Sequence, residues 1–120
     1  MSLTSVDHVQ LAMPKGGEGP ARDFYVGVLG LTEMPKPPDL SGRGGAWFTS
    51  GTVNVHLGVD PEFRPAVKAH PAFQVADIRG IERRARAAGY TIATGEPLPG
   101  FDRIFVYDPF GNRIELMQKS

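Results

Sequence analysis

Residues 108–116 read DPFGNRIEL, a turn followed by a strand in which charged and apolar residues alternate. Turns with this composition need a residue of positive φ, which either Gly111 or Asn112 can supply. Side chains on a strand point alternately to its two faces, so Ile114 and Leu116 share one face and Glu115 lies on the other. The segment therefore predicts the second half of a hairpin, with one face suited to a core and a carboxylate opposite it.

The same pattern occurs once earlier, at residues 51–59, which read GTVNVHLGV. Gly51 corresponds to Gly111 in the turn, and His56 corresponds to Glu115 in the strand that follows. Self-similarity of this kind indicates an internal structural repeat.

Working outward from the two hairpins gives the same order of elements in each half. Helix starts and stops are marked by Pro20, Asp77 as an N-cap, and the glycines Gly30 and Gly89. The first half is expected to contain a strand at 5–13, a helix at 20–29 and strands at 32–35, 46–49 and 53–59. The second half is expected to contain a strand at 70–75, a helix at 78–88 and strands at 90–94, 104–108 and 113–117.

The predicted fold is α+β, with paired βαβββ modules forming a curved mixed-sheet cup. A chain of 120 residues is expected to form a single domain over 1–120. Within it the first module covers 5–59, a linker covers 60–69 and the second module covers 70–118.

The overall composition excludes several classes of function. The 13 basic and 13 acidic residues give a formal net charge of zero, which is not the footprint of a nucleic-acid or membrane-surface protein. There is no cysteine, so disulfides, thiolate nucleophiles and cysteine zinc sites are excluded. No targeting segment or long apolar run is evident, and a cytoplasmic location is expected.

Three histidines and one carboxylate occupy related positions in the two halves. His8 and His70 lie in the first strand of each half, and His56 and Glu115 lie in the last. A single strand histidine is more often exposed or hydrogen-bonded than a ligand. All four, however, are predicted to lie opposite the helix-packing face, and convergence of imidazole and carboxylate groups is what a divalent metal ion requires.

Four segments carry a resemblance to a known family: Val6–Leu11 (VDHVQL), Phe24–Leu31 (FYVGVLGL), His70–Phe73 (HPAF) and Asp108–Leu116 (DPFGNRIEL). With them, nearly the whole chain resembles the vicinal oxygen chelate superfamily, the group of glyoxalases, bleomycin resistance proteins and extradiol dioxygenases. It implies a paired βαβββ fold, often in a homodimer. In many relatives the metal ligands come from two subunits, and the sequence leaves open whether the site is formed within one chain.

The resemblance implies that His8, His70 and Glu115 are metal ligands. His56 takes the position of a fourth ligand, where relatives usually have glutamate or glutamine. It is either that ligand or an acid or base acting on the substrate, with Glu115 as the other candidate base. Zinc, nickel, iron, copper or manganese is expected in preference to magnesium or calcium.

The function implied by the resemblance is that of a metal-dependent enzyme whose small oxygenated substrate binds the ion through two neighbouring oxygens. A lyase or isomerase activity of the glyoxalase type is expected rather than a dioxygenase activity. The alternative is an antibiotic- or small-molecule-binding resistance protein without catalysis. Candidate substrate contacts are Gln10, Trp47, Arg103 and Phe105, although each aromatic residue is as readily a core residue.

Overall fold

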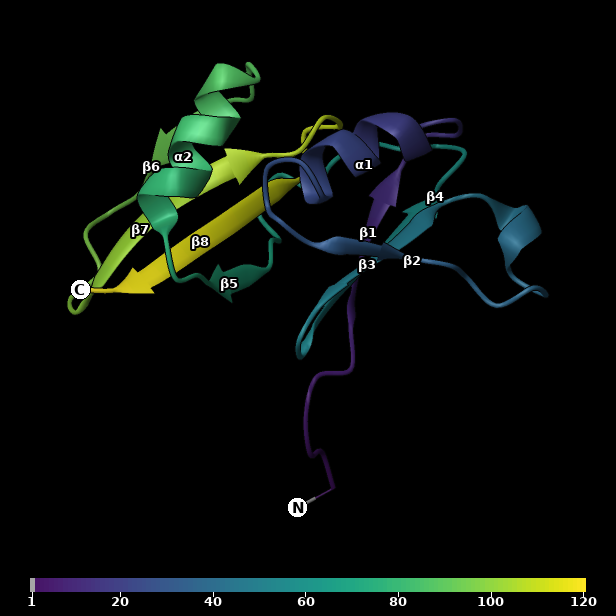
Figure 1. Cartoon of the computed structure of the whole chain (residues 1–120), viewed down its shortest axis with the longest axis horizontal. Helices are drawn as coiled ribbons and strands as arrows, with labels where there is room; N and C mark the ends of the chain where they lie inside the picture. The colour runs from purple at the N-terminus through teal and green to yellow at the C-terminus, as the bar shows by residue number, and fades with distance from the viewer. Residues whose placement is uncertain (1) are drawn as a thin grey trace. The chain divides into compact units, whose positions relative to one another are not determined.

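A computed structural model describes residues 2–120 of the chain. The chain divides into two compact units, Met1–Arg64 (unit 1) and Pro65–Ser120 (unit 2). Each unit contains one strand, one helix and three further strands in that order (Figure 1). The predicted α+β class and the pair of βαβββ modules are therefore confirmed. No helix of the described residues is long and apolar enough to cross a membrane.

Unit 1 contains a four-stranded sheet in the order β1-β4-β3-β2, in which β1 runs parallel to β4 and the other neighbours are antiparallel. Its elements are β1 Val9–Met13, α1 Glu18–Tyr25, β2 Thr32–Met34, the short 3₁₀ helix η1 Ser41–Arg43, β3 Ala46–Ser50 and β4 Val53–Val59.

Unit 2 repeats this topology in a sheet of order β5-β8-β7-β6, again with its first and last strands parallel. Its elements are β5 Ala72–Gln74, α2 Ile78–Ala87, β6 Ile92–Thr94, β7 Phe101–Tyr107 and β8 Arg113–Lys119.

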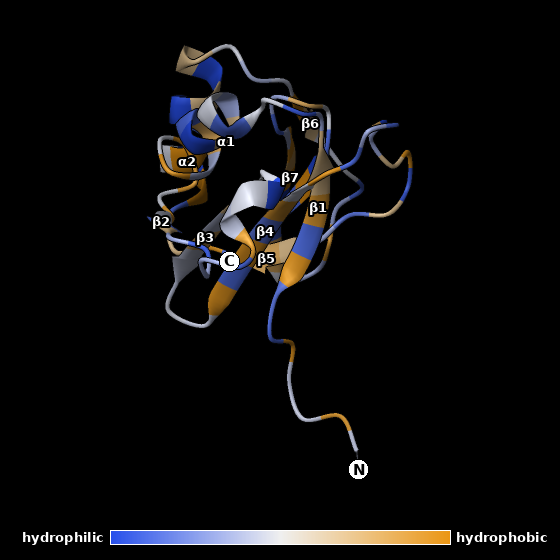
Figure 2. Ribbon diagram, turned by 90° about the vertical axis from the view of Figure 1, so that its right-hand side faces the viewer, coloured by the Kyte–Doolittle hydropathy of each residue, from blue (hydrophilic) through white to orange (hydrophobic). Residues whose placement is uncertain are grey.

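The core of unit 1 lies between α1 and one face of its sheet. Phe24 and Tyr25 of α1 are fully buried, and the ring of Tyr25 stacks on Phe48 of β3 at 5.3 Å between centroids. Val55 and Leu57 of β4 complete the same face, and β1 is hydrophobic apart from one hydrophilic band at Gln10 (Figure 2). The opposite face of the sheet is thereby left to the polar side chains.

The core of unit 2 is built in the same way, with Ile78 and Ala85 of α2 buried beside Val106, Ile114 and Leu116 of β7 and β8. The predicted N-cap is confirmed, because the carboxylate of Asp77 accepts a 3.0 Å hydrogen bond from the amide of Gly80. The predicted stop at Gly89 is also confirmed, with a φ angle of +85° directly after the C-cap of α2. The predicted stop at Gly30 was wrong, because α1 ends at Tyr25 and Gly30, with a φ of +78°, lies in the turn that follows.

Both first strands begin later than predicted, so His8 and His70 lie in extended segments just before β1 and β5. In unit 1 the side chain of Asn54 donates to the carbonyl oxygen of Asp7 and takes the place of a ladder bond at that point. In unit 2 Pro71 accepts from the amide of Glu115 but has no N–H to donate, so β5 begins only at Ala72, two residues later than predicted.

The helix predicted at 20–29 is also shifted, to Glu18–Tyr25. The amides of Val28 and Leu29 both bond to the carbonyl oxygen of Phe24, so the chain turns back toward β2 before the apolar spacing ends. The positive φ belongs to Gly111 rather than Asn112 in the turn between β7 and β8.

Candidate functional site

In unit 1 the candidate residues lie on the sheet face opposite α1. His56 of β4 pairs with Gln10 of β1 on one side and with Trp47 of β3 on the other. Directly paired residues point to the same face of a sheet, so the three side chains share one surface. His8 lies two residues before Gln10 and reaches the same surface through its ring contact with His56.

Unit 2 has an equivalent register. Glu115 of β8 pairs with Ala72 of β5 and with Phe105 of β7. His70 lies two residues before Ala72, as His8 does before its strand partner. The correspondence inferred from sequence between His56 and Glu115 therefore extends to hydrogen-bonded strand positions, and it adds a correspondence between Trp47 and Phe105.

The aromatic rings of unit 1 form a continuous stack. His56 lies between His8 and Trp47, with centroid distances of 4.1 Å to each and interplanar angles of 14° and 8°. Nδ1 of His8 donates to the carboxylate of Asp7 at 3.0 Å, because a carboxylate oxygen can only accept. In the neutral ring, Nε2 of His8 is then the nitrogen that carries a lone pair.

The stacked position lowers the pKa of His56. Burial disfavours its charged form, and the neighbouring His8 acts in the same direction, while Asp7 opposes them with a smaller effect. His56 is therefore held neutral at neutral pH, the form that can bind a metal ion or accept a proton.

The free energy of unfolding is expected to fall as the pH is lowered from about 7.5 to 5.5, partly because of His56. The unfolded chain binds this proton near its ordinary pKa of about 6.5, whereas the folded protein binds it only at lower pH. Melting temperatures across this range should show a smaller loss for His56→Gln than for the parent protein. A difference between the two proteins that does not change with pH would contradict the prediction.

In unit 2 the central contact joins His70 and Glu115. Nε2 of His70 lies 2.9 Å from a carboxylate oxygen of Glu115, and Nδ1 of the same ring lies 2.9 Å from the carbonyl oxygen of Lys68. The carbonyl can only accept, so Nδ1 carries a hydrogen. The Nε2 lone pair of a neutral ring would then face a carboxylate, and a cation between them, either a proton or a metal ion, makes the contact favourable.

Two guanidinium groups surround Glu115 and its partner Phe105. Arg103 lies 3.5 Å from the second oxygen of Glu115 and also donates to the carbonyl oxygen of Glu96 at 2.5 Å. Arg113 stacks over Phe105 at 3.9 Å, and Arg103 lies 5.3 Å from the same ring. Arg113 was assigned no role from the sequence. It lies two residues before Glu115, so strand alternation puts both side chains on one face, and this spacing is the signal that could have identified it.

The residues fit a metal ion in their donor chemistry. Two ligand atoms that are each about 2.1 Å from an ion and at right angles lie about 3.0 Å apart, close to the spacing between His70 and Glu115. Metal-bound histidines usually donate their other ring N–H to an oxygen, as His8 and His70 do. Within the described residues no group of three or more histidine or acidic side chains is gathered around one point.

Comparison with known proteins gives matches over the full length of the chain. The sequence model of the Glyoxalase/Bleomycin resistance protein/Dioxygenase superfamily matches residues 6–116. A search of curated protein sequences gave no match. Among solved structures, a protein from Bacillus anthracis assigned to the glyoxalase family is 42% identical, with a TM-score of 0.93 over 100% of this chain and 98% of that one.

Two more distant structures share the fold. The fosfomycin resistance protein FosX from Listeria monocytogenes is 16% identical, with a TM-score of 0.76 over 98% of this chain and 95% of that one. TnmS3, an antibiotic-binding protein from Streptomyces sp. CB03234, is 20% identical, with a TM-score of 0.73 over 100% of this chain and 99% of that one.

Proposed function

The chain belongs to the glyoxalase/bleomycin resistance protein/dioxygenase superfamily, and we propose that it is a metal-dependent enzyme of the lyase or isomerase type. Its substrate is a small oxygenated molecule that binds through two neighbouring oxygens. The observation that carries this proposal is the contact between Nε2 of His70 and the carboxylate of Glu115. With Nδ1 bonded to the Lys68 carbonyl, the pair presents two lone pairs to one point.

His70 and Glu115 would hold the ion together with His8, whose ring is oriented by Asp7 in the equivalent way. A bound divalent ion supplies Lewis acidity, which stabilises negative charge developing on substrate oxygen. The same three residues are proposed as ligands whether one chain supplies all of them or two copies of the predicted homodimer share them. A cytoplasmic location remains part of the same proposal.

We assign His56 to proton transfer rather than to metal binding. Its ring is nearly parallel to that of His8 at 4.1 Å, so the in-plane lone pairs of the two rings lie in separate planes. Burial keeps the ring neutral and able to accept a proton. Trp47 stacks on the other side of the His56 ring. Gln10 pairs with His56 and Phe105 pairs with Glu115, so each shares a sheet face with a residue of the proposed site.

The second candidate is a binding protein that sequesters a small molecule without changing it. In its favour, none of the described residues form a ready-made group of three donors. The superfamily includes a protein described as antibiotic-binding, and this chain shares its fold. Metal content separates the two candidates, because sequestration alone needs no ion.

The test is elemental analysis of protein purified without chelators, followed by calorimetric titration of the metal-free protein with zinc, nickel and manganese. The proposal expects about one ion per site, and exchange of a substrate carbon-bound proton with deuterated water only when metal is present. Simple 2-oxo and 2-hydroxy compounds are suitable substrates for this exchange. If no first-row metal is found and none is taken up, the enzyme proposal fails and the binding protein is favoured.

A further inference from the structure

Unit 1 contains a cavity of about 220 Å³ on the sheet face that carries Gln10 and Trp47. Its walls come from β1, β3 and β4 and from the loop between β2 and β3. The lining residues are Gln10, Lys36, Leu40, Arg43, Gly44, Trp47, Leu57, Gly58 and Val59. At roughly 30 Å³ for each water-sized group, the space accommodates about seven such groups, the size of a small organic molecule.

The cavity has a positive wall. Lys36 and Arg43 are its two charged lining residues, and none of the described lining residues is acidic. The carboxylate of Glu18 lies beside the lining residue Gly44, but it accepts a 2.7 Å bond from the amide of Gly45 and is engaged with the loop backbone. A ligand in the cavity therefore meets two cations and no competing side-chain anion of the wall.

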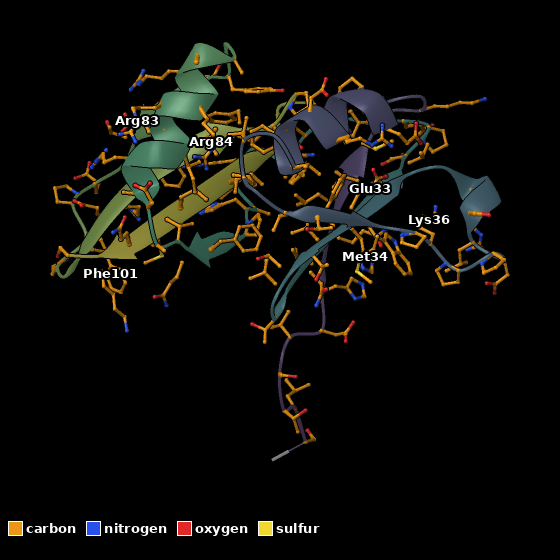
Figure 3. All side chains as sticks on the ribbon, viewed as in Figure 1. Glu33, Met34, Lys36, Arg83, Arg84 and Phe101 are labelled. Atoms are coloured by element: carbon orange, nitrogen blue, oxygen red, sulfur yellow. The ribbon has the colours of Figure 1, made fainter. Side chains whose placement is uncertain are left out.

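The loop brings these two cations to the same cavity although six residues separate them in the sequence. Lys36 lies just beyond β2, where the chain leaves the sheet (Figure 3), and its ammonium group donates to the carbonyl oxygen of Gly44. The amides of Leu40 and Ser41 both bond to the carbonyl oxygen of Pro37, which tightens the segment between them. Lys36 and Arg43 therefore lie at the two ends of a closed loop.

Trp47 connects the cavity to the stacked histidines, because its indole contacts His56 and also lines the cavity. Leu40 adds apolar surface beside Trp47. The side chain of Gln10 lies directly over Gly58, because a Cβ atom placed on Gly58 would be 2.4 Å from Nε2 of Gln10. One end of the cavity is thus suited to an anion and the other to a planar or apolar body.

We propose that this cavity is the subsite for the anionic end of a small organic acid, a carboxylate or phosphonate held by Lys36 and Arg43 with its body against Trp47. The inference rests on the proposed function, because it specifies the charge of the substrate with which His56 would exchange a proton. Arg103, the cation among the substrate contacts predicted from the sequence, already pairs with Glu115 and the Glu96 carbonyl. Lys36 and Arg43 were missed because an irregular loop has no periodicity to reveal them.

The single tryptophan of the chain makes the test direct, because all tryptophan fluorescence comes from Trp47. The full-length protein is titrated with benzoate, with inorganic phosphate and with benzamide, the neutral isostere of benzoate. Saturable binding of benzoate is expected, at least tenfold tighter than that of benzamide and weaker at high salt. Phosphate binding without benzoate binding would mean an inorganic-anion site and would overturn the organic-acid assignment.

Arg43→Gln and Lys36→Gln are each expected to weaken benzoate binding about fivefold to tenfold, as removal of one charge-assisted contact does. Lys15→Gln in the turn after β1 and Arg83→Gln on α2 remove exposed cations elsewhere and should leave it unchanged. Equal binding of benzamide and benzoate, or parent-like affinity in both cavity variants, would overturn the proposal.

Each titration is made on metal-free and on metal-treated protein, so that the two proposals can fail separately. Benzoate binding that depends on Arg43 and Lys36 in a protein that takes up no metal would leave the subsite standing without the enzyme. Metal uptake without benzoate binding would overturn the subsite alone.

Discussion

Glu115→Gln is expected to weaken divalent metal binding roughly 100-fold or more. Losing a partner that merely orients a ligand already costs about 10- to 100-fold, and Glu115 would contact the ion itself. Glutamine keeps the shape of the side chain but removes the charge that faces Nε2 of His70 at 2.9 Å. Competition with a chromophoric chelator measures the change in affinity for zinc, nickel and manganese.

Glu82→Gln is the matched control for this substitution. Glu82 is also an ion-paired carboxylate of unit 2, in contact with Arg79 and Arg86 on α2, but it has no histidine partner. Pairs on the exposed face of a helix contribute little to stability, so this variant should fold and bind metal as the parent does. Thermal unfolding of both variants shows whether lost affinity reflects lost structure, and parent-like metal affinity in folded Glu115→Gln would exclude Glu115 as a ligand.

The two hairpins made the relation between His56 and Glu115 predictable. Strand alternation has a period of two, so a short apolar pattern is enough to assign each of them to the face opposite the core. The paired turns at Gly51 and Gly111 then align the strands, and the observed registers follow this alignment. This part of the site depends on local sequence, which explains why it could be predicted.

The ring contacts depend on neighbours distant in sequence and could not be predicted in the same way. Alternation placed His8 opposite the helix-packing face, and Trp47 was named as a candidate substrate contact, but nothing indicated that both would stack on His56. The late starts of β1 and β5 arise from Asn54 and from the missing N–H of Pro71, which act across the sheet. Such interactions fix side-chain orientation only once strand pairing is known.

The duplicated framework supports different electrostatics in its two halves. The central residue of unit 1, His56, has aromatic neighbours on both sides and is kept neutral. The equivalent Glu115 in unit 2 is buried between Nε2 of His70 and the guanidinium of Arg103, which supplies a charge to a buried carboxylate. One topology thus provides an imidazole between aromatic rings in one half and a carboxylate beside a guanidinium in the other, the groups that we propose as proton acceptor and metal ligand.

Gly45→Ala is expected to lower the free energy of unfolding by about 3 kcal/mol or more, the largest effect among single glycine substitutions in unit 1. Gly45 has a φ of +86°, and a Cβ atom there would lie 2.2 Å from the carbonyl oxygen of Leu57 in β4. The clash is with backbone, so relief requires the loop or β4 to move. Urea unfolding monitored by circular dichroism measures the loss.

Two other glycines separate the contributions to this effect. Gly51 has a φ of +57° but nothing within 4 Å of an added Cβ, so Gly51→Ala should show only the backbone strain, about 1 kcal/mol. Gly42 has open space and no positive φ, so Gly42→Ala should be within about 0.5 kcal/mol of the parent. If Gly45→Ala were no worse than Gly51→Ala, the close approach of the loop to β4 would be wrong. Gly44 and Leu57 both line the proposed anion subsite, so the lining of that subsite would then be wrong as well.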